Sequence, residues 1–249
     1  MKALVCELCG SNDIVKQDGY FVCQACGTKY TLEEAKKLMI EGVVDIQGTV
    51  KVDTSDKIQN YYTIARRAKD TGNNEEAGRY YDLILQEQPD SWEATFYITY
   101  FSCSQTNNAG IGNAVVRLNK TVKSVLDMIG KIADRDEQMS AIDDIAWNAS
   151  SMYCFLYDAQ CNFFNSIALT AGLKYSEAHA LTIDGCCIAL YNLGDTIKAK
   201  FPEKTFLATK MWEIGVKKEE AKLVQTKETK ATAANRKALI KKYDPNSAF

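Results

Sequence analysis

The most regular pattern of hydrophobic and polar positions lies in residues 58–91, IQNYYTIARRAKDTGNNEEAGRYYDLILQEQPDS. Apolar residues recur there every three or four positions, which predicts two amphipathic helices around the turn signal TGNN. The apolar stripes are Tyr61, Ile64, Ala65 and Ala68 in the first helix and Ala77, Tyr80, Tyr81 and Ile84 in the second. Because Ala65 and Ala77 are small, we expect the two helices to pack closely, and Pro89 ends the unit.

The same periodicity continues through the rest of the chain. A helix with Ser91 as its N-cap begins at SWEATFYITYF, and further helices are predicted over 112–134, 136–171, 175–200 and 203–242. The breaks fall at TNNAGIGN, near Gly172-Leu173 and at FPEK. One helix pair cannot bury its own hydrophobic face, so these helices should stack into an all-α domain over 58–249.

The first 40 residues follow a different pattern. Asp18-Gly19 is a hairpin turn signal between short apolar stretches, and Thr31 with Glu34 forms a capping box for a short helix. Residues 41–57 are β-branched and lack helical periodicity, which predicts an extended linker with room for one short strand. The predicted fold class is therefore mainly α, with a small β-hairpin unit over 1–40.

Two Cys-x-x-Cys-Gly motifs frame this hairpin, CELCG at 6–10 and CQACG at 23–27. Two residues between paired cysteines let both thiolates face one metal ion, and the following glycine suits the positive φ of such a turn. Four thiolates are the usual ligands of a structural Zn²⁺ ion, so Cys6, Cys9, Cys23 and Cys26 are predicted to bind one zinc per chain. Iron, a redox Cys-x-x-Cys pair and unliganded cysteines remain as alternatives, and iron is the main one because four thiolates accept both metals.

These motifs resemble a zinc ribbon of the transcription-factor-IIB type over about residues 4–30. The resemblance implies that the four cysteines are the zinc ligands. Many such ribbons carry a proline inside the first knuckle, where this chain has Glu7-Leu8.

The 34 residues 58–91 resemble a tetratricopeptide repeat, a helix–turn–helix unit of that length. Small, turn, aromatic and helix-ending residues stand at the corresponding places: Ala65, Gly72, Ala77, Tyr81 and Pro89. The combination of ribbon and repeat also resembles a group of zinc-ribbon proteins from bacteria and phages.

Composition narrows the function classes. The 30 basic and 32 acidic residues nearly balance, so overall charge indicates neither a nucleic-acid nor a membrane partner. Five further cysteines at irregular positions argue against a secreted disulfide framework, and no signal peptide or membrane span is evident, so we expect a cytoplasmic protein. Cys154, Cys161, Cys186 and Cys187 are expected to be buried as small hydrophobic residues.

No catalytic motif and no small-molecule substrate site is evident. The chain has one histidine, His179, which we expect to be on the surface or partly packed. Asp134, Asp136 and Glu137 are expected at a helix start, where acids favour the helix dipole, although with Asp143 and Asp144 they also suit a metal-dependent hydrolase.

The stretch 216–242 is basic, with nine Lys or Arg residues and three acids. The cations are Lys217, Lys218, Lys222, Lys227, Lys230, Arg236, Lys237, Lys241 and Lys242. They form either a solvated helix face or, together with the ribbon, a nucleic-acid contact. The ribbon itself has three basic and three acidic residues in 1–30 and four thiolates, which disfavours phosphate binding.

The function expected from these features is that of a non-enzymatic zinc-binding adaptor. Its helical domain would bind a protein or peptide partner. A nucleic-acid-binding regulatory protein is the alternative, and it predicts strongly salt-dependent binding.

Overall fold

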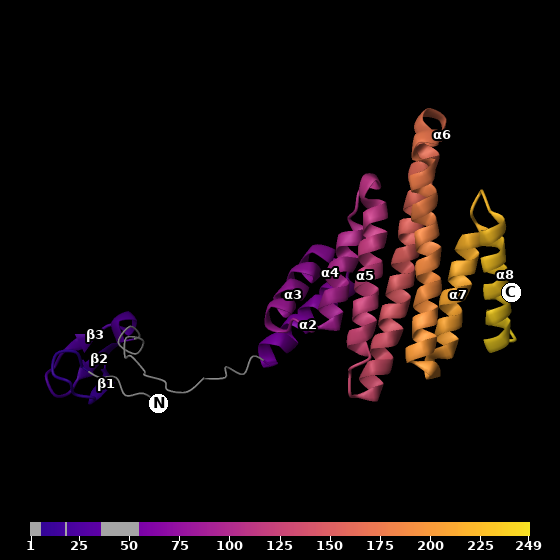
Figure 1. The fold of residues 1–249 in the computed structure, drawn as a ribbon. Helices are drawn as coiled ribbons and strands as arrows, with labels where there is room; N and C mark the ends of the chain where they lie inside the picture. Colours follow the sequence, from indigo (N-terminus) through magenta and orange to yellow (C-terminus); the bar gives the residue numbers. More distant parts are fainter. Residues whose placement is uncertain (1–5, 18, 36–54) are drawn as a thin grey trace. The chain divides into compact units, whose positions relative to one another are not determined.

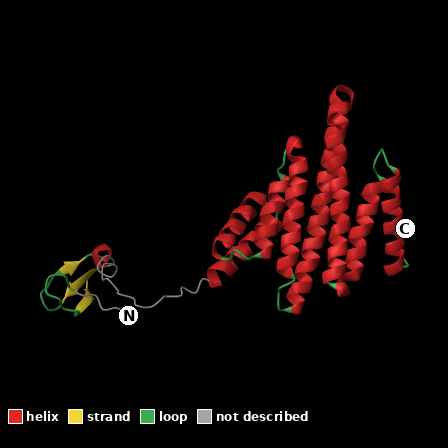
Figure 2. Cartoon of the chain, in the orientation of Figure 1, coloured by secondary structure: helices red, strands yellow, loops and turns green. Residues whose placement is uncertain are grey.

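The computed structural model describes residues 6–17, 19–35 and 55–249, with the backbone alone at 55, 56 and 168–173. The chain divides into two compact units, Met1–Asp53 and Thr54–Phe249. The described strands all belong to the first unit, and the second is helical (Figure 2). The predicted fold class, mainly α with a small N-terminal hairpin unit, is confirmed. Most of the predicted linker 41–57 lies outside the described residues, and its last three residues, 55–57, are helical.

The first unit contains a three-stranded antiparallel sheet in the order β1-β2-β3 (Figure 1). Its strands are β1 (Ile14–Gln17), β2 (Tyr20–Cys23) and β3 (Lys29–Tyr30). Gln17 pairs with Tyr20, and Gly19 between them has a φ of 86°, which suits a tight hairpin turn. The predicted hairpin is therefore confirmed.

The predicted capping box begins a helix after β3. The amide of Thr31 donates to the Glu34 carboxylate at 2.8 Å, and the amide of Glu34 donates to the Thr31 hydroxyl at 3.3 Å. Residues 32–35 are helical, and the rest of this predicted helix lies outside the described residues.

The second unit is built from helices joined by short turns (Figure 1). They are α2 (Ser55–Asp70), α3 (Asn74–Glu87), α4 (Trp92–Ser104), α5 (Ile111–Ile129), α6 (Arg135–Lys200), α7 (Thr205–Glu220) and α8 (Lys227–Tyr243). Ser91 caps α4 as predicted, and Gly72 has a φ of 76° in the turn between α2 and α3. None of these helices has the length and apolar run that a membrane crossing requires.

The predicted single helix over 203–242 is wrong, because the chain turns back between α7 and α8. The Thr226 side chain accepts a hydrogen bond from the amide of Thr229 and so caps a new helix. After this turn, Lys237 of α8 pairs with Glu220 of α7 at 2.7 Å. Likewise the helix predicted over 112–134 ends earlier, at Ile129 before Gly130.

The backbone of α6 is helical from Arg135 to Lys200, but this segment folds back on itself (Figure 1). The rings of Phe163 and Tyr175 lie 6.1 Å apart, and those of Phe164 and His179 lie 4.2 Å apart. A straight helix would separate residues 12 positions apart by about 18 Å. The chain therefore reverses between Phe164 and Tyr175, where the sequence predicted a break at Gly172-Leu173.

Alternate helices of this unit run parallel to each other. The Tyr62 hydroxyl of α2 lies 2.6 Å from that of Ser91, at the start of α4, and Lys69 donates to Tyr97, farther along α4, at 3.2 Å. Tyr97 in turn donates to Asp144 of α6 at 2.7 Å.

The same arrangement links α6 to α7. Lys204, at the start of α7, pairs with Asp143 at 2.6 Å, and Lys218, near its end, pairs with Asp158 at 2.6 Å. Residue numbers rise in the same direction on both helices, so the first half of α6 and α7 are parallel. Residues 55–249 therefore form four antiparallel pairs stacked in sequence: α2–α3, α4–α5, the two halves of α6, and α7–α8.

Two glycines permit the closest helix contact. An ideal Cβ at Gly194 would lie 2.5 Å from Nε1 of Trp212, and one at Gly215 would lie 2.6 Å from the ring of Tyr191. Both rings are buried, so neither has room to move. The second half of α6 and α7 can pack at this distance only because both positions lack a side chain.

We expect Gly194→Ala and Gly215→Ala each to lower the free energy of unfolding by about 2 kcal/mol through overpacking. Gly78→Ala is the control, because its added Cβ would meet nothing closer than 3.8 Å and lies inside α3. That change should raise stability by up to about 1 kcal/mol. Urea unfolding of the three variants measures both effects, and equal stability of all three would contradict this account of the contact.

Candidate metal centre and candidate groove

The two Cys-x-x-Cys-Gly motifs adopt the same backbone geometry. In the first, the amide of Cys6 donates to the carbonyl of Ser11 at 2.8 Å, and the amide of Gly10 donates to the carbonyl of Cys6 at 2.8 Å. In the second, Cys23 donates to Thr28 at 2.9 Å, and Gly27 donates to Cys23 at 2.8 Å. The repeated sequence thus forms two equivalent knuckles.

The glycine that ends each knuckle is required by its backbone conformation. Gly10 has a φ of 72° and Gly27 a φ of 76°. Nothing lies within 4 Å of a Cβ added at either position, so space is not the constraint. Side chains other than glycine rarely adopt this left-handed conformation, which explains why glycine follows both cysteine pairs.

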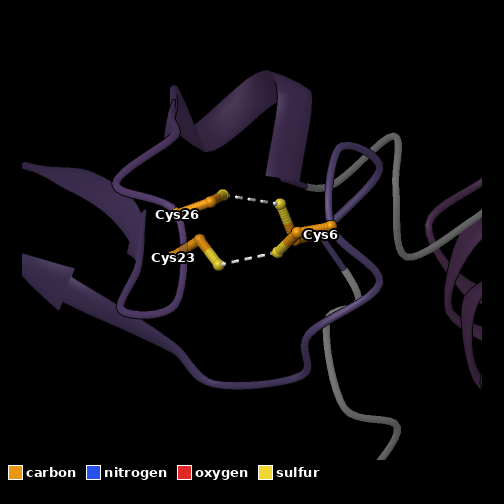
Figure 3. Close-up of side chains that lie close together, drawn as sticks. Cys6, Cys23 and Cys26 are labelled. Carbon is orange, nitrogen blue, oxygen red and sulfur yellow. Dashed lines mark hydrogen bonds between the residues drawn. The ribbon is translucent and has the colours of Figure 1, made fainter.

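The knuckles bring the four predicted ligands together. The Sγ atoms of Cys6, Cys9, Cys23 and Cys26 all lie within 4.8 Å of one another. Cys6 and Cys26 are 3.6 Å apart, as are Cys9 and Cys23, and Figure 3 shows the thiols of the two knuckles facing each other. Sulfurs that bind one zinc ion in a tetrahedron at about 2.3 Å lie about 3.8 Å apart. The arrangement therefore fits a four-thiolate metal site.

Two hydroxyl groups contact the sulfurs from outside the cluster, and the sequence motifs assign neither of them a role. The Tyr30 hydroxyl lies 3.1 Å from Sγ of Cys6 and accepts a hydrogen bond from the Glu7 amide at 3.2 Å. Thr28 lies 3.1 Å from Sγ of Cys26. The motif spacing gives no signal for these partners, because the β2–β3 pairing places Tyr30 beside the first knuckle.

These contacts shift the thiols in opposite directions. The hydrogen bond from Tyr30 lowers the pKa of Cys6 to about 6, and that from Thr28 lowers the pKa of Cys26. The pKa of Cys9 is raised to about 12, since the Ser11 amide, which lowers it, is outweighed by neighbouring thiols and burial. Four thiolates without a cation repel one another, and a divalent metal ion offsets their charge.

Such a site is closed to chemistry at the metal. With four protein ligands, a tetrahedral ion keeps no position for water or substrate, which is typical of structural zinc. Zinc and iron both accept this ligand set, so the sulfur geometry supports metal binding and leaves the metal's identity to the inference from ligand type.

The predicted basic stretch is not a continuous row of free cations. Five of its nine members contact groups of the same unit: Lys218 with Asp158, Lys222 with Asp184 and Glu219, Arg236 with Asp195, Lys237 with Glu220, and Lys241 with the carbonyl of Ser247. Lys217 and Lys242 lie over the rings of Phe249 and Tyr243. Lys227 and Lys230 have no ion-pair partner among the described residues.

The acidic candidates serve structural contacts. Asp134 caps α6 through the amide of Glu137, as the helix-start interpretation predicted. Asp143 pairs with Lys204, and Asp144 accepts from Tyr97. Within the described ranges, the four ribbon cysteines form the one group of three or more potential metal ligands whose ligand atoms converge.

The remaining cysteines and the histidine are packed among helices. Cys186 and Cys187 are buried as predicted, whereas Cys154 and Cys161 are half-buried, so the prediction of burial was too strong for these two. Burial raises the pKa of the Cys186 thiol to about 12. His179 is half-buried against the ring of Phe164, and burial lowers its pKa.

A groove of about 880 Å³ lies in the helical unit. Its walls come from α2, the start of α4, the end of α5 and the first half of α6, with Tyr62, Arg66, Trp92, Lys131, Glu137 and Asp144 among the lining residues. Arg66 donates two hydrogen bonds, one of 2.9 Å and one of 2.5 Å, to the buried carboxylate of Glu93. Glu93 also accepts from the Tyr81 hydroxyl at 2.8 Å, so this wall is held by satisfied polar contacts.

An exposed stripe on α6 extends away from the groove. Ser140 and Asp144 line the groove, and the stripe continues at helical spacing through Trp147, Ser151 and Phe155. Trp147 is 47% exposed and Phe155 is 48% exposed. Two large aromatic side chains thus stand in solvent on the same helix face as the groove.

Comparison with known proteins agrees with the metal site. Residues 1–32 match the model of a zinc ribbon domain family, which places a zinc ribbon at the N-terminus and supports zinc as the metal. No curated protein and no solved structure matched the chain. The resemblance to the transcription-factor-IIB type stays a prediction, because the family that matched is a different zinc ribbon.

Purified protein should contain one zinc ion per chain, and Cys23→Ser should release it, because a serine hydroxyl is a poor zinc ligand. Elemental analysis by mass spectrometry measures the zinc. Cys154→Ser, a half-buried cysteine in the helical unit, is the control and should keep full occupancy. Folded wild-type protein without bound metal would contradict the assignment.

Tyr30→Phe should lower zinc affinity by about 10-fold, because it removes the hydrogen bond to Cys6 while keeping the ring. Competition with a chelator of known affinity measures the change. Tyr20→Phe is the matched control, since Tyr20 is half exposed on the hairpin and belongs to the same unit. An equal effect of both changes would rule out a specific role for the Tyr30 hydroxyl.

Proposed function

We propose that this chain is a non-enzymatic, zinc-binding adaptor. The ribbon holds one structural zinc ion, and the helical unit binds a segment of a protein partner along the groove and the exposed stripe of α6. The observation that carries the proposal is the groove of about 880 Å³ that continues into two exposed aromatic side chains.

Three features support a protein segment as the occupant. Aromatic residues are enriched at the energetic centres of protein interfaces, and Trp147 and Phe155 stand exposed beside the groove. The parallel helices that form the walls are linked by buried polar contacts, so the groove is formed before binding. Polar side chains such as Lys131 and Glu137 lie at its edge, as is usual at the rim of an interface.

The stacked helix pairs support a tetratricopeptide-like interpretation of this unit. Ala65 and Ala77 are fully buried where the two helices of residues 58–91 meet, and Tyr81 is fully buried next to them. Successive pairs repeat the antiparallel arrangement, which is how helical repeats bury their apolar faces. Stacked repeats of this kind provide extended surfaces for binding a partner.

Nucleic-acid binding through the ribbon and the basic stretch is the less favoured function. Five of the nine proposed cations are held by groups of the same unit, which reduces their availability for phosphates. Lys227 and Lys230 are the cations that retain the freedom this function requires.

Affinity capture with the tagged full chain, divided into nuclease-treated and untreated halves, tests the proposal. We expect a specific protein to survive nuclease and its recovery to fall at least 10-fold with Ser140→Trp, which fills the groove, and with Trp147→Ala. Asn113→Trp, an equally bulky change at an exposed position of α5 outside the groove, is the control.

Two outcomes would contradict the adaptor. If every recovered protein disappears with nuclease and with the double variant Lys227→Glu/Lys230→Glu, nucleic acid is the ligand. If recovery survives nuclease and is equal in Ser140→Trp, Trp147→Ala and Asn113→Trp, the groove is not the binding site.

A further inference from the structure

A second pocket, of about 460 Å³, lies between α5 and the second half of α6. It shares no lining residue with the groove described above. Its inner surface is apolar, formed by Val122 and Leu126 of α5 and by Ala189 and Leu193 of α6. These side chains are all at most 5% exposed, so the pocket reaches the hydrophobic core.

One lining residue comes from behind the pocket. Tyr153 belongs to the first half of α6, whereas the other lining residues belong to α5 or to the second half of α6. Its side chain must cross the core to reach the pocket, so the hydroxyl, the atom farthest from its own backbone, lies at the floor. The residue is 1% exposed.

The Tyr153 hydroxyl has no hydrogen-bond partner among the residues that the structure describes. Burial raises its pKa, so the group stays protonated and can donate. Buried hydroxyls are nearly always hydrogen-bonded, because an unpaired one costs stability. Phenylalanine would fill the same space without that cost, so the hydroxyl calls for a partner from outside the chain.

The rim of the pocket is polar but carries no net charge. Lys123 and Lys200 stand against Asp127 and Asp195. Lys200 is paired with Asp127, and Asp195 accepts hydrogen bonds from Arg236 and from Nε1 of Trp212. The side-chain amides of Asn119 and Asn192 also line the rim and make no hydrogen bond within the described part of the chain.

We propose that this pocket binds a neutral, mostly apolar small molecule whose one hydrogen-bond acceptor meets the Tyr153 hydroxyl. The volume is in the range of small-molecule sites, and an apolar interior with a few placed polar groups is their usual chemistry. An ionised ligand has no unpaired counter-charge at the floor and would lose solvation there. This inference is independent of the adaptor function, since the two sites share no lining residue.

Ligand-observed NMR on the zinc-loaded full chain tests the inference. The probes are benzamide and benzyl alcohol, which are neutral, and benzoate and benzylamine, which carry a charge on a similar ring. The two neutral probes should bind at least 10-fold more tightly than the charged ones. Tyr153→Phe should weaken neutral-probe binding about 5- to 10-fold, and Ala189→Phe, which fills the pocket, should abolish it.

Tyr157→Phe is the matched control. Tyr157 lies about one turn farther along α6, and its hydroxyl already donates to the carbonyl of Lys218 at 2.9 Å. It should leave probe binding unchanged. Tyr153→Phe should keep or slightly raise the melting temperature, because it removes an unpaired buried hydroxyl, which separates loss of binding from loss of fold. Absence of binding by both neutral probes, or equal binding by wild type and Tyr153→Phe, would overturn the proposal.

Discussion

Every helix pair of residues 55–249 leaves an apolar face that only the next pair can bury. The contact of α2 with α3 through Ala65 and Ala77 does not complete a core, because the ring of Tyr81 is buried by stacking on Tyr97 of α4, with centroids 5.3 Å apart. Each pair is stabilised by its neighbour in this way, and the stack grows along the chain. The groove and the small pocket are both products of this stacking, with walls formed by different residues.

Polar contacts between alternate helices give the stack its direction. Apolar faces alone would tolerate several arrangements, but Glu93 is 6% exposed and needs both Arg66 and Tyr81 to satisfy its carboxylate. Leaving a buried carboxylate without such partners costs more than the usual hydrogen bond contributes. Those partners are in reach only when α4 lies parallel to α2, so the same contacts that hold the wall of the groove also set the register of the helices.

The ribbon solves a different physical problem. Its apolar core consists of Cys6, Cys23, Tyr30 and Ala35, with Ile14 and Phe21 packed against it. A unit of this size buries too little apolar surface to fold by itself, so a cross-link or a metal ion must supply the difference. Two of the core residues are also metal ligands, and Tyr30 contacts one of them, so metal binding and folding of this unit are parts of one equilibrium.

Local pattern in the sequence was enough to predict the hairpin, the capping box at Thr31, the metal ligands and the pair of helices in residues 58–91, because each depends on neighbours within a few turns. It was not enough for the parts that long-range contacts decide. The basic stretch 216–242 looked unpaired because Asp158, Asp184 and Asp195, which neutralise three of its cations, lie far away on α6. The continuous helix predicted over 203–242 was wrong because the tertiary gain of packing α8 against α7 exceeds the local preference for one helix. The sequence by itself determined a metal-binding ribbon and a set of amphipathic helices. Only the tertiary structure decided which helices lie parallel, and that arrangement creates the groove, the exposed stripe and the pocket, since their walls come from residues far apart in the chain.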